Sequence, residues 1–290
     1  MTPEQLLDTP DLIAAGVAGD DVRRRLHGMR TTFVRVFEIH VDAPPPALPA
    51  RTHAGEVRLI GRPASLEALL GAARSAVKLA GGVPVTVSSV ADLLDLGTPV
   101  RSVCDALRDA GVSAMAQLPI DSVEDIQRVA ADARAAGVPI LTLTLNALDD
   151  DRRLEMCRRA FELQASIGGF RAFAPLPRSL STSKPTTGYD DVKQIALARI
   201  VVSNIDSIQV DWALYGPKLA QVALTVGAND VDQVAAVDPG VLGTRRSPLE
   251  EIKGNITAAS LEPVERDGMF RVNFQLPTSN SQGRADSFGR

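Results

Sequence analysis

The sequence contains only two cysteines, Cys104 and Cys157, among its 290 residues. Both fall within stretches that we predict to be helical, and they are far apart along the chain. Two distant cysteines in an intracellular chain are typical of buried thiols rather than of a disulfide. The sequence therefore excludes a disulfide framework as the basis of this fold.

Three further absences exclude broad classes of function. There is no basic block, and the net charge is −4, from 31 basic and 35 acidic residues, which argues against nucleic acid as the main partner. Apolar runs stay well short of the roughly 20 residues that a membrane span needs. Residues 1–20 contain early acids and no basic-then-apolar signal pattern, so we expect a cytoplasmic protein.

The composition that remains is ordinary for a folded protein, with 45% hydrophobic and 23% charged residues. The length is sufficient for one large α/β domain with a full core. We predict a single domain over residues 1–270 with a helical lead-in at its start. Residues 271–290 are polar and contain glycine and serine, so we predict a loose tail there.

Strand-like and helix-like segments alternate along most of the chain. Such alternation implies a parallel sheet, and a spacing of about 25–30 residues suits a TIM-type (β/α) barrel, complete or partial. A doubly wound open sheet is the alternative, which the absence of a Gly-x-Gly-x-x-Gly motif after the first strand weakens. The predicted strands are residues 31–40, 57–60, 83–88, 112–118, 138–145, 170–176 and 208–213, and the main predicted helices are 65–79, 99–110, 121–136, 149–167 and 189–204.

Residues 206–232 contain one β/α unit with its start and stop signals intact. A short apolar strand is followed by Gly216 and Pro217, and proline suits the first turn of a helix because its missing N–H would be unpaired there. The helix is predicted to run to about Leu224, with Gly227 just beyond its end.

The same stretch carries a family likeness. Residues 188–232 resemble the radical S-adenosylmethionine enzymes of the futalosine route to menaquinone, above all aminofutalosine synthase. The likeness is carried by I-A-L-A-R-I-V-V-S-N-I and then by I-Q-V-D-W-A-L-Y-G-P-K-L-A-Q-V-A-L-T-V-G-A-N-D-V-D. Dehypoxanthine futalosine cyclase and the FO synthase subunits are relatives in that family. Residues 22–33, 168–176 and 261–267 extend the likeness. The resemblance implies a barrel of the radical S-adenosylmethionine type.

The chain departs from this family at the position that matters most for its chemistry. The resemblance implies three cysteines, spaced C-x-x-x-C-x-x-C, soon after the first strand, where they hold the 4Fe–4S cluster that cleaves S-adenosylmethionine. Residues 41–55 contain no cysteine and carry Pro44, Pro45, Pro46 and Pro49 instead. The loops expected after other strands also lack the family's Gly-rich and His-containing motifs. We therefore expect no 4Fe–4S cluster and no other cofactor.

Candidate ligand-binding residues lie mainly in and after the last predicted β/α unit. Lys218 follows the predicted helix start, and a helix N-terminus with a nearby lysine can receive an anion. Trp212 and Tyr215 are expected at the barrel mouth, and Asn229 and Asp230 in a strand-to-loop position, where they either bind a ligand or build a turn. Arg178, with Arg171, Lys184 and the hydroxyls of Ser179, Ser181, Thr182 and Ser183, is expected on the other side of the mouth.

No metal site is expected. His40 and His53 bracket the proline-rich loop and Asp42 is nearby, but two imidazoles separated by a loop lack the close spacing of a ligand set.

Three hypotheses of function remain open. The favoured one is a cluster-less homologue of aminofutalosine synthase, a pseudoenzyme that binds a small acidic or nucleoside-like ligand or a catalytic relative in menaquinone biosynthesis. The second is an enzyme with non-radical lyase, hydrolase or transferase chemistry on a chorismate- or futalosine-like acid, using candidates such as Asp211, Asp230, Lys218, His40 and Glu38. The third is an interaction subunit with a filled barrel mouth.

Overall fold

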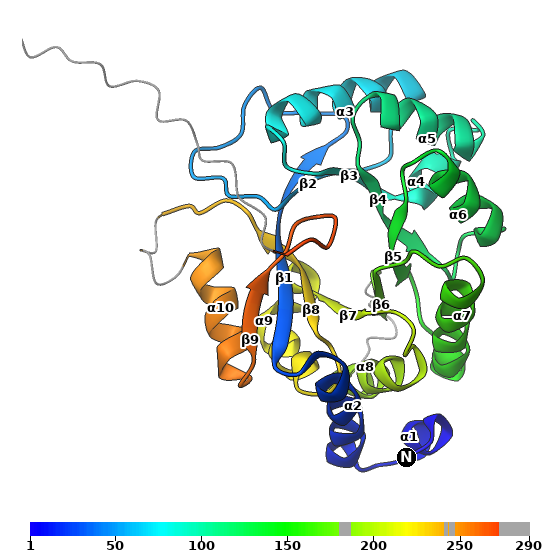
Figure 1. The fold of residues 1–290 in the computed structure, drawn as a ribbon, viewed down its shortest axis with the longest axis vertical. Coiled ribbons are helices and arrows are strands. Elements are labelled where there is room, and N and C mark those ends of the chain that lie inside the picture. Colours follow the sequence, from blue (N-terminus) through cyan, green and yellow to red (C-terminus); the bar gives the residue numbers. More distant parts are fainter. Residues whose placement is uncertain (180–186, 241–242, 244–246, 273–290) are drawn as a thin grey trace, which may run out of the picture.

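The fold is a closed barrel of parallel strands surrounded by helices, as the computed structural model shows (Figure 1). The structure describes residues 1–179, 187–240, 243 and 247–272. Within them, nine strands form one sheet in the order β2-β3-β4-β5-β6-β7-β8-β1-β9. The strands are β1 Arg30–His40, β2 Glu56–Ile60, β3 Val85–Ser89, β4 Ala114–Pro119, β5 Ile140–Leu145, β6 Ala172–Pro177, β7 Ser207–Asp211, β8 Asp230–Ala235 and β9 Glu262–Glu265.

Strand β1 closes the barrel because it pairs with both β2 and β8. Its last residues, Val36 to His40, pair with β2, whereas its first residues, Arg30 to Phe33, pair with β9. Strands β2 and β9 therefore share one edge of β1, one following the other. All of these pairings are parallel, so the C-terminal strand ends meet at one mouth of the barrel and the N-terminal strand ends at the other.

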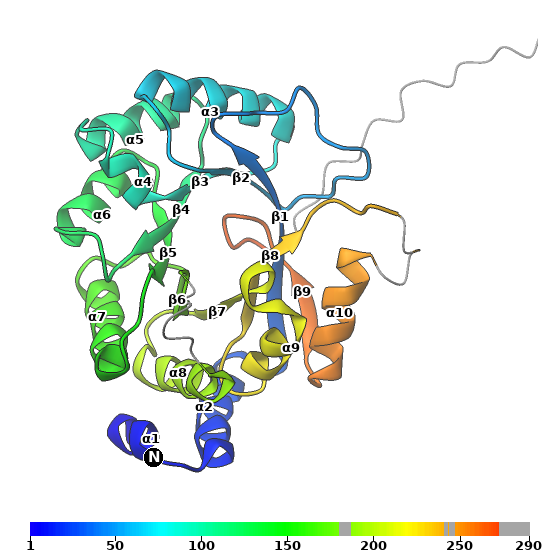
Figure 2. The same cartoon turned by 180° about the vertical axis from the view of Figure 1, so that it is seen from behind.

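Helices cover the outside of the ring of strands (Figures 1 and 2). Helices α1 and α2 pack against α8, and α10 packs beside α9 and β9. The helices are α1 Pro3–Asp8, α2 Leu12–His27, α3 Leu66–Ala80, α4 Val90–Leu94, α5 Val100–Asp109, α6 Ile126–Ala135, α7 Arg153–Ser166, α8 Gly188–Val201, α9 Trp212–Leu224 and α10 Pro248–Ala258, with a 3-10 turn at Asp150–Arg152. None of the described helices is long and apolar enough to cross a membrane.

The two faces of the strands differ in character. In β2, β7 and β8, buried polar residues alternate with members of the apolar core. Because successive side chains of a strand point to opposite faces, the polar set faces the barrel interior and the apolar set faces the helices. The polar set comprises Glu56, Arg58, Gln209, Asp211, Asp230 and Asp232, and the apolar set Val57, Leu59, Ile208, Val210 and Val231.

The predicted (β/α) barrel is confirmed, and it is complete. Ser65 caps α3 as its position predicts, since its hydroxyl accepts a hydrogen bond from the Ala68 amide at 3.1 Å. The open doubly wound sheet is excluded because β1 pairs with both β2 and β8.

Two local predictions are wrong, namely the start of α9 and the start of the helix predicted at residue 121. Helix α9 begins at Trp212, not at Pro217, because the Asp211 carboxylate caps it by accepting a hydrogen bond from the Leu214 amide at 2.8 Å. Gly216, with φ of 73°, then breaks the helix, and Pro217 starts its second part. Asp121 does not cap a helix; its carboxylate accepts hydrogen bonds from the Asn146 and Ala147 amides, and α6 begins only at Ile126.

The C-terminal part contains more structure than the sequence predicts. Strand β8, helix α10 and strand β9 have no counterpart among the predicted elements. At the end of the described chain, Arg266 and Val272 form an antiparallel bridge, and the intervening residues curve back into the ring of strands in both Figure 1 and Figure 2. Of the predicted loose tail, residues 273–290 lie outside the described residues.

Candidate functional site

Arg58, on β2, is the centre of a buried charge network inside the barrel. Its guanidinium donates two hydrogen bonds to the Glu56 carboxylate, at 2.7 and 2.9 Å, and two to the Asp232 carboxylate, each at 3.0 Å. The Thr86 hydroxyl donates to Glu56 at 2.5 Å. Charge-assisted, bidentate bonds of this kind are strong and geometrically specific. Burial alone would raise the pKa of Asp232, but the charge and hydrogen bonds of Arg58 outweigh it and hold that pKa well below its usual value.

Arg178 extends this network to the C-terminal mouth. It follows β6 directly, and one of its terminal nitrogens, Nη1, forms an ion pair with Asp211 at the end of β7. The other, Nη2, lies 3.9 Å from Asp232 Oδ2 and, among the described residues, has no hydrogen-bond acceptor. Burial raises the pKa of Asp211, although the charge of Arg178 opposes that shift. Arg178 thus joins the buried network around Arg58 to the carboxylate at the end of β7.

Two aromatic residues stand beside this pair. Trp212 follows Asp211 directly and is half-buried. The Tyr215 hydroxyl donates a hydrogen bond to the carbonyl oxygen of Pro177, the last residue of β6, at 2.6 Å. Helix α9 therefore brings both aromatic side chains to the C-terminal end of the barrel, together with Arg178. Lys218 lies one turn further along α9, beyond the kink, and is exposed.

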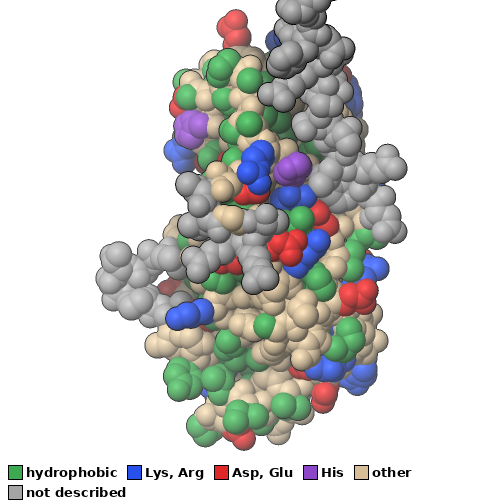
Figure 3. Space-filling model, turned by 90° about the vertical axis from the view of Figure 1, so that its left-hand side faces the viewer, with side chains coloured by type: hydrophobic (Ala, Val, Ile, Leu, Met, Phe, Trp, Pro, Cys, Tyr) green, Lys and Arg blue, Asp and Glu red, His purple; other side chains and the backbone are tan. Residues whose placement is uncertain are grey.

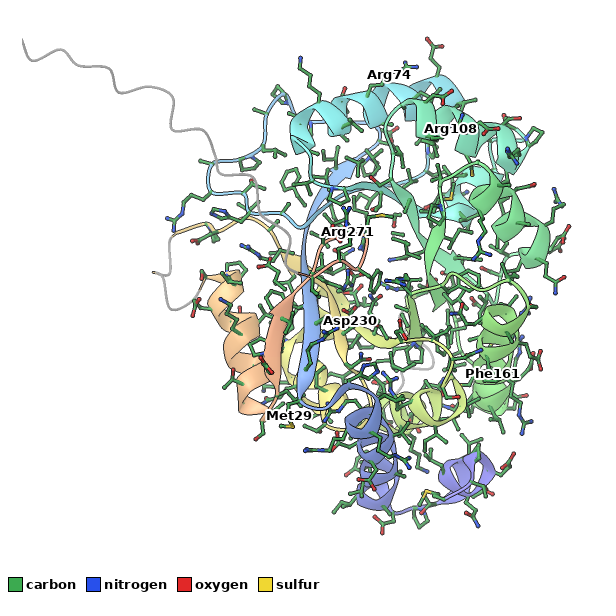
Figure 4. The ribbon with its side chains drawn as sticks, viewed as in Figure 1. Met29, Arg74, Arg108, Phe161, Asp230 and Arg271 are labelled. Carbon is green, nitrogen blue, oxygen red and sulfur yellow. The ribbon has the colours of Figure 1, made fainter. Side chains whose placement is uncertain are left out.

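Asp230 belongs to a second ion pair, nearer the N-terminal strand ends. Its carboxylate accepts hydrogen bonds from Arg266 at 2.6 and 2.8 Å, from Gln209 at 2.8 Å and from the Thr32 hydroxyl at 2.5 Å. Figure 4 shows Asp230 in the interior, beside β1. The Arg266 guanidinium also lies over the Phe270 ring, 3.8 Å from its centre. This arrangement joins the segment after β9 to the inside of the barrel.

Several sequence predictions are corrected by these positions. Asn229 and Asp230 do not lie in a loop at a strand end, because Asp230 begins β8 and Asn229 directly precedes it. Asn229 is buried and accepts hydrogen bonds from Arg199 and from the Ile208 amide. Arg171 precedes β6 and therefore lies at the opposite end of the barrel from Arg178. Of the predicted set, the structure brings together Arg178, Trp212 and Tyr215.

Other predicted positions fall outside that group. Lys184 and the hydroxyls of Ser181, Thr182 and Ser183 lie outside the described residues. Glu38 is exposed at the end of β1 and accepts a hydrogen bond from Gln233 at 2.8 Å.

Sequence reasoning missed Glu56, Arg58, Asp232 and Arg266. A signal was present in the short runs E-V-R-L-I and D-V-D-Q-V, where charged residues alternate with β-branched and apolar ones. That alternation ordinarily marks a strand with one face in solvent. In a closed barrel the second face is the interior, so the charges must pair with one another.

The family resemblance places the ligands of a 4Fe–4S cluster in the segment between β1 and β2. Such a cluster needs cysteine thiolates, and residues 41–55 contain none. The segment is held against the chain that follows β8, since the His53 amide donates to the Ala236 carbonyl oxygen at 2.8 Å and Arg51 pairs with Asp238 at 2.6 Å. His40 and Asp42 are exposed, with 3.6 Å between His40 Nδ1 and Asp42 Oδ2.

The two cysteines of the chain do not supply the missing ligands. Cys104 lies on α5 and Cys157 on α7, in the outer layer of helices, and both side chains are buried. Burial raises the pKa of each thiol to about 12, which disfavours the thiolate that binds metals. The residues present therefore do not fit the cluster that the family resemblance implies. Among the described residues, no three His, Cys, Asp or Glu side chains are grouped in a way that could hold a metal ion.

Comparison with known sequences identifies relatives of this chain. The CofH/MqnC C-terminal region family matches residues 172–275. An aminodeoxyfutalosine synthase of Thermus thermophilus is 30% identical over 208 residues, which cover 60% of this chain and 55% of the relative. A 5-amino-6-(D-ribitylamino)uracil–L-tyrosine 4-hydroxyphenyl transferase of Methanosarcina acetivorans is 32% identical over 148 residues, covering 44% of this chain and 38% of the relative. The matches thus span about half, or less, of the lengths of these relatives.

Comparison with solved structures confirms the fold. The FeFe-hydrogenase maturase HydG aligns with a TM-score of 0.62 at 15% identity, covering 91% of this chain and 72% of that structure. Methylornithine synthase aligns with a TM-score of 0.60 at 13% identity, covering 90% and 92% of the two chains. At such low identity the likeness concerns the barrel architecture alone.

Proposed function

The chain belongs to the radical S-adenosylmethionine family of futalosine and FO synthase-like proteins, and we propose that it binds a nucleoside-like molecule at the C-terminal mouth of its barrel without radical chemistry. The observation that carries the proposal is the cysteine-free segment 41–55 inside a barrel that otherwise keeps the family's fold. Because cluster formation needs three nearby thiolates, no rearrangement of this segment provides them.

The charge balance at the mouth favours a neutral polar ligand over an acid. Arg58 and Arg178 face three carboxylates, those of Glu56, Asp211 and Asp232. A carboxylate ligand would add a further negative charge to a site where negative charges already outnumber positive ones. Hydroxyl and amide groups, in contrast, can donate to the Asp211 carboxylate without changing that balance.

The name of one relative agrees with such a ligand. It contains a ribityl-substituted uracil, which is a pyrimidine base with a polyhydroxylated chain. Trp212 and Tyr215 offer flat apolar surfaces beside Arg178, on which a base can stack. A role in menaquinone biosynthesis, beside a catalytic relative, is the pathway context that this proposal implies.

Ligand binding can be followed through Trp212, the one tryptophan of the chain. We expect a saturable change in tryptophan fluorescence when the neutral compound 5-amino-6-(D-ribitylamino)uracil is added to iron-free protein, and weaker binding of futalosine, which carries a carboxylate. Arg178→Gln should weaken binding by about tenfold, since it removes the ion pair that holds Asp211, whose charged hydrogen bond to the ligand contributes ~1.5–3 kcal/mol. Arg74→Gln, an exposed arginine on α3 (Figure 4), is the matched control and should bind as the wild type does. No saturable change with either compound, or equal affinities in the two variants, would contradict the proposal.

The absence of a cluster has its own test. After anaerobic reconstitution with iron and sulfide, we expect no stoichiometric iron and no broad visible absorption. A preparation with about four irons per chain and the spectrum of a 4Fe–4S centre would overturn this part of the proposal.

One observation favours a second function, a non-radical enzyme. Burial raises the pKa of Asp211 at the mouth, which suits a proton donor or acceptor. Turnover of the same compounds by iron-free protein, abolished in Asp211→Asn and kept in Glu38→Gln, would support it. Binding without turnover leaves the binding function in place.

A further inference from the structure

A cavity of about 300 Å³ opens at the N-terminal end of the barrel, opposite the mouth described above. Its walls come from the end of α2, the starts of β1 and β7, the residues before β6 and β8, and the segment after β9. The lining residues are Leu26, His27, Arg30, Thr32, Arg171, Asp206, Ser207, Asn229, Arg266, Phe270 and Val272. This volume is at the lower end of the range of small-molecule sites, ~300–1,000 Å³.

The arginines of this cavity differ in whether a carboxylate neutralises their charge. Arg266 is paired with Asp230 and is buried. Arg30 and Arg171 are exposed, and within the part of the chain that the structure describes neither side chain has a hydrogen bond or an ion pair. Asp206 is the one carboxylate among the described lining residues, and it too is exposed. The positive charges at the cavity are therefore in excess.

A second layer behind the wall adds to this excess. Arg199, on α8, is fully buried, and its side chain contacts only neutral groups among the described residues: the carbonyl oxygens of Gly227 and Asp206, the side-chain oxygen of Asn229 and the His27 ring. Burial and then the charge of Arg23 lower the pKa of Arg199 to about 9, against an opposing effect of Asp206. Burial and the charges of Arg199, Arg23 and Arg30 lower the pKa of His27 to about 4, and Asp206 opposes that shift too. Both shifts come first from burial, and the neighbouring arginines add to them.

Apolar and hydroxyl groups complete the cavity. Leu26, Phe270 and Val272 provide apolar wall, and Ser207 offers a hydroxyl at the start of β7. Such a mixture suits an organic anion better than a free inorganic ion, because the apolar wall contacts the carbon skeleton while the guanidinium groups receive the charge.

We propose that this cavity binds a small organic anion, a carboxylate or a phosphate ester, whose charged group is held by Arg30 and Arg171. The site is independent of the proposed nucleoside-like site, because it lies at the other end of the strands. It goes beyond the family function, since in barrel enzymes the chemistry occurs at the C-terminal strand ends.

The proposal is tested with succinate and glycerol 3-phosphate as probes, each titrated in buffer of constant ionic strength adjusted with sodium chloride. Binding to the folded state raises the unfolding temperature in a saturable way. We expect at least one probe to do so with wild-type protein. The apparent affinity for that probe should fall at least about tenfold in Arg30→Gln and in Arg171→Gln, since each variant loses a charged hydrogen-bond donor. Succinate alone would identify a carboxylate ligand, and glycerol 3-phosphate alone a phosphate ester.

Two controls make the result specific. Arg74→Gln removes an exposed arginine far from the cavity and should titrate as the wild type does. Trp212 lies at the opposite end, so its fluorescence should stay unchanged while these probes bind, which separates this site from the mouth. The inference is overturned if neither probe stabilises the protein saturably, or if Arg30→Gln, Arg171→Gln and Arg74→Gln respond alike.

Discussion

The two ends of the barrel contain similar numbers of charged side chains but balance them differently. At the C-terminal half, Arg58 contacts two carboxylates and Arg178 is paired with Asp211. At the N-terminal end, among the described residues, Arg30 and Arg171 have no partner. The comparison teaches that the presence of arginines does not define an anion site. What matters is whether carboxylates of the same chain already neutralise them.

On the face shown in Figure 3, charged side chains at the surface lie near side chains of opposite charge. Acidic and basic side chains lie close together there, with histidine side chains among them, and no large area of a single charge is visible beside the undescribed residues. An exposed pair on this scale is screened by solvent and contributes little. Inside the barrel the same pairing has larger consequences, because an unpaired charge cannot be solvated.

The largest effect is expected from breaking the buried network. Arg58→Met leaves Glu56 and Asp232 without their main partner, and loss of one member of a buried ion pair costs ~3–5 kcal/mol. Urea denaturation should show this loss in the free energy of unfolding. Arg62→Met is the matched control: Arg62 pairs with Asp95 at 2.8 Å, but both side chains are more than half exposed, so a loss of at most ~1 kcal/mol is expected. Equal losses in both variants would show that the interior charges are not buried as described.

A smaller effect is expected from changing the helix that supplies the N-terminal wall. A Cβ at Gly19, on α2, would lie 2.2 Å from the Val226 carbonyl oxygen and 2.9 Å from the Ala196 Cα. Gly19→Ala should therefore destabilise by ~1–3 kcal/mol through overpacking. It should also weaken anion binding, since α2 positions His27 and leads into Arg30, and leave binding at the C-terminal mouth unchanged.

Gly71, on α3, provides the control for that substitution. A Cβ there meets no atom within 4 Å, so Gly71→Ala should stabilise by up to ~1 kcal/mol through helix propensity. Destabilisation of the same size in both variants would mean that the contact between α2 and α8 is looser than the structure shows.

The pH dependence of stability tests the environment of His27 at the N-terminal end of the barrel. The pKa of His27 is lowered from 6.5 to about 4, first by burial and then by the charges of Arg199, Arg23 and Arg30, although Asp206 opposes the shift. Between these values the unfolded chain binds a proton that the folded chain does not, so the contribution of His27 to stability is complete above about 6.5 and is lost as pH falls toward about 4. His27→Gln should show a shallower fall of the unfolding free energy across this window.

The comparison of wild-type protein with His27→Gln removes the contributions of the other titrating groups. The pKa of Asp211 is raised by burial, so its contribution has the opposite sign and declines as pH rises. It is present in both proteins and cancels. His53→Gln, which removes an exposed histidine, is the control, and an identical slope in all three proteins would contradict the described environment of His27.

The smallest effect is expected at the segment between β1 and β2. The ion pair of Arg51 and Asp238 is more than half exposed on its arginine side, so Arg51→Gln should lower the free energy of unfolding by less than ~1 kcal/mol, and the difference should shrink in 1 M salt. The backbone hydrogen bond from His53 to Ala236 keeps the segment in place. A loss comparable to that of Arg58→Met would show that this segment is essential to the barrel.

Much of the fold was predictable because its signals are local. Residues 30–224 alternate between β-branched or apolar runs and helices with recognisable ends, such as Ser65 before α3 and Gly81 after it. Strand β9 had no such signal, since the run E-P-V-E is short and is ordered only by pairing with β1, more than 200 residues earlier. The candidate site is predictable in part for the same reason. Arg178 and Trp212 directly follow strands, and Tyr215 lies about one turn after Trp212, whereas the partners of Arg58 and Arg266 cannot be inferred.

The sequence by itself determined that three clustered thiols are absent, because the number and order of cysteines are covalent facts that no folding changes. It also determined the repeated β/α pattern, since helix and strand periodicity arise from neighbouring residues. Only the tertiary structure decided which arginines are neutralised. The bonds from Arg58 to Asp232 span 174 positions, and Arg171 and Arg178 lie at opposite ends of one strand, so their roles depend on contacts that form when the barrel closes.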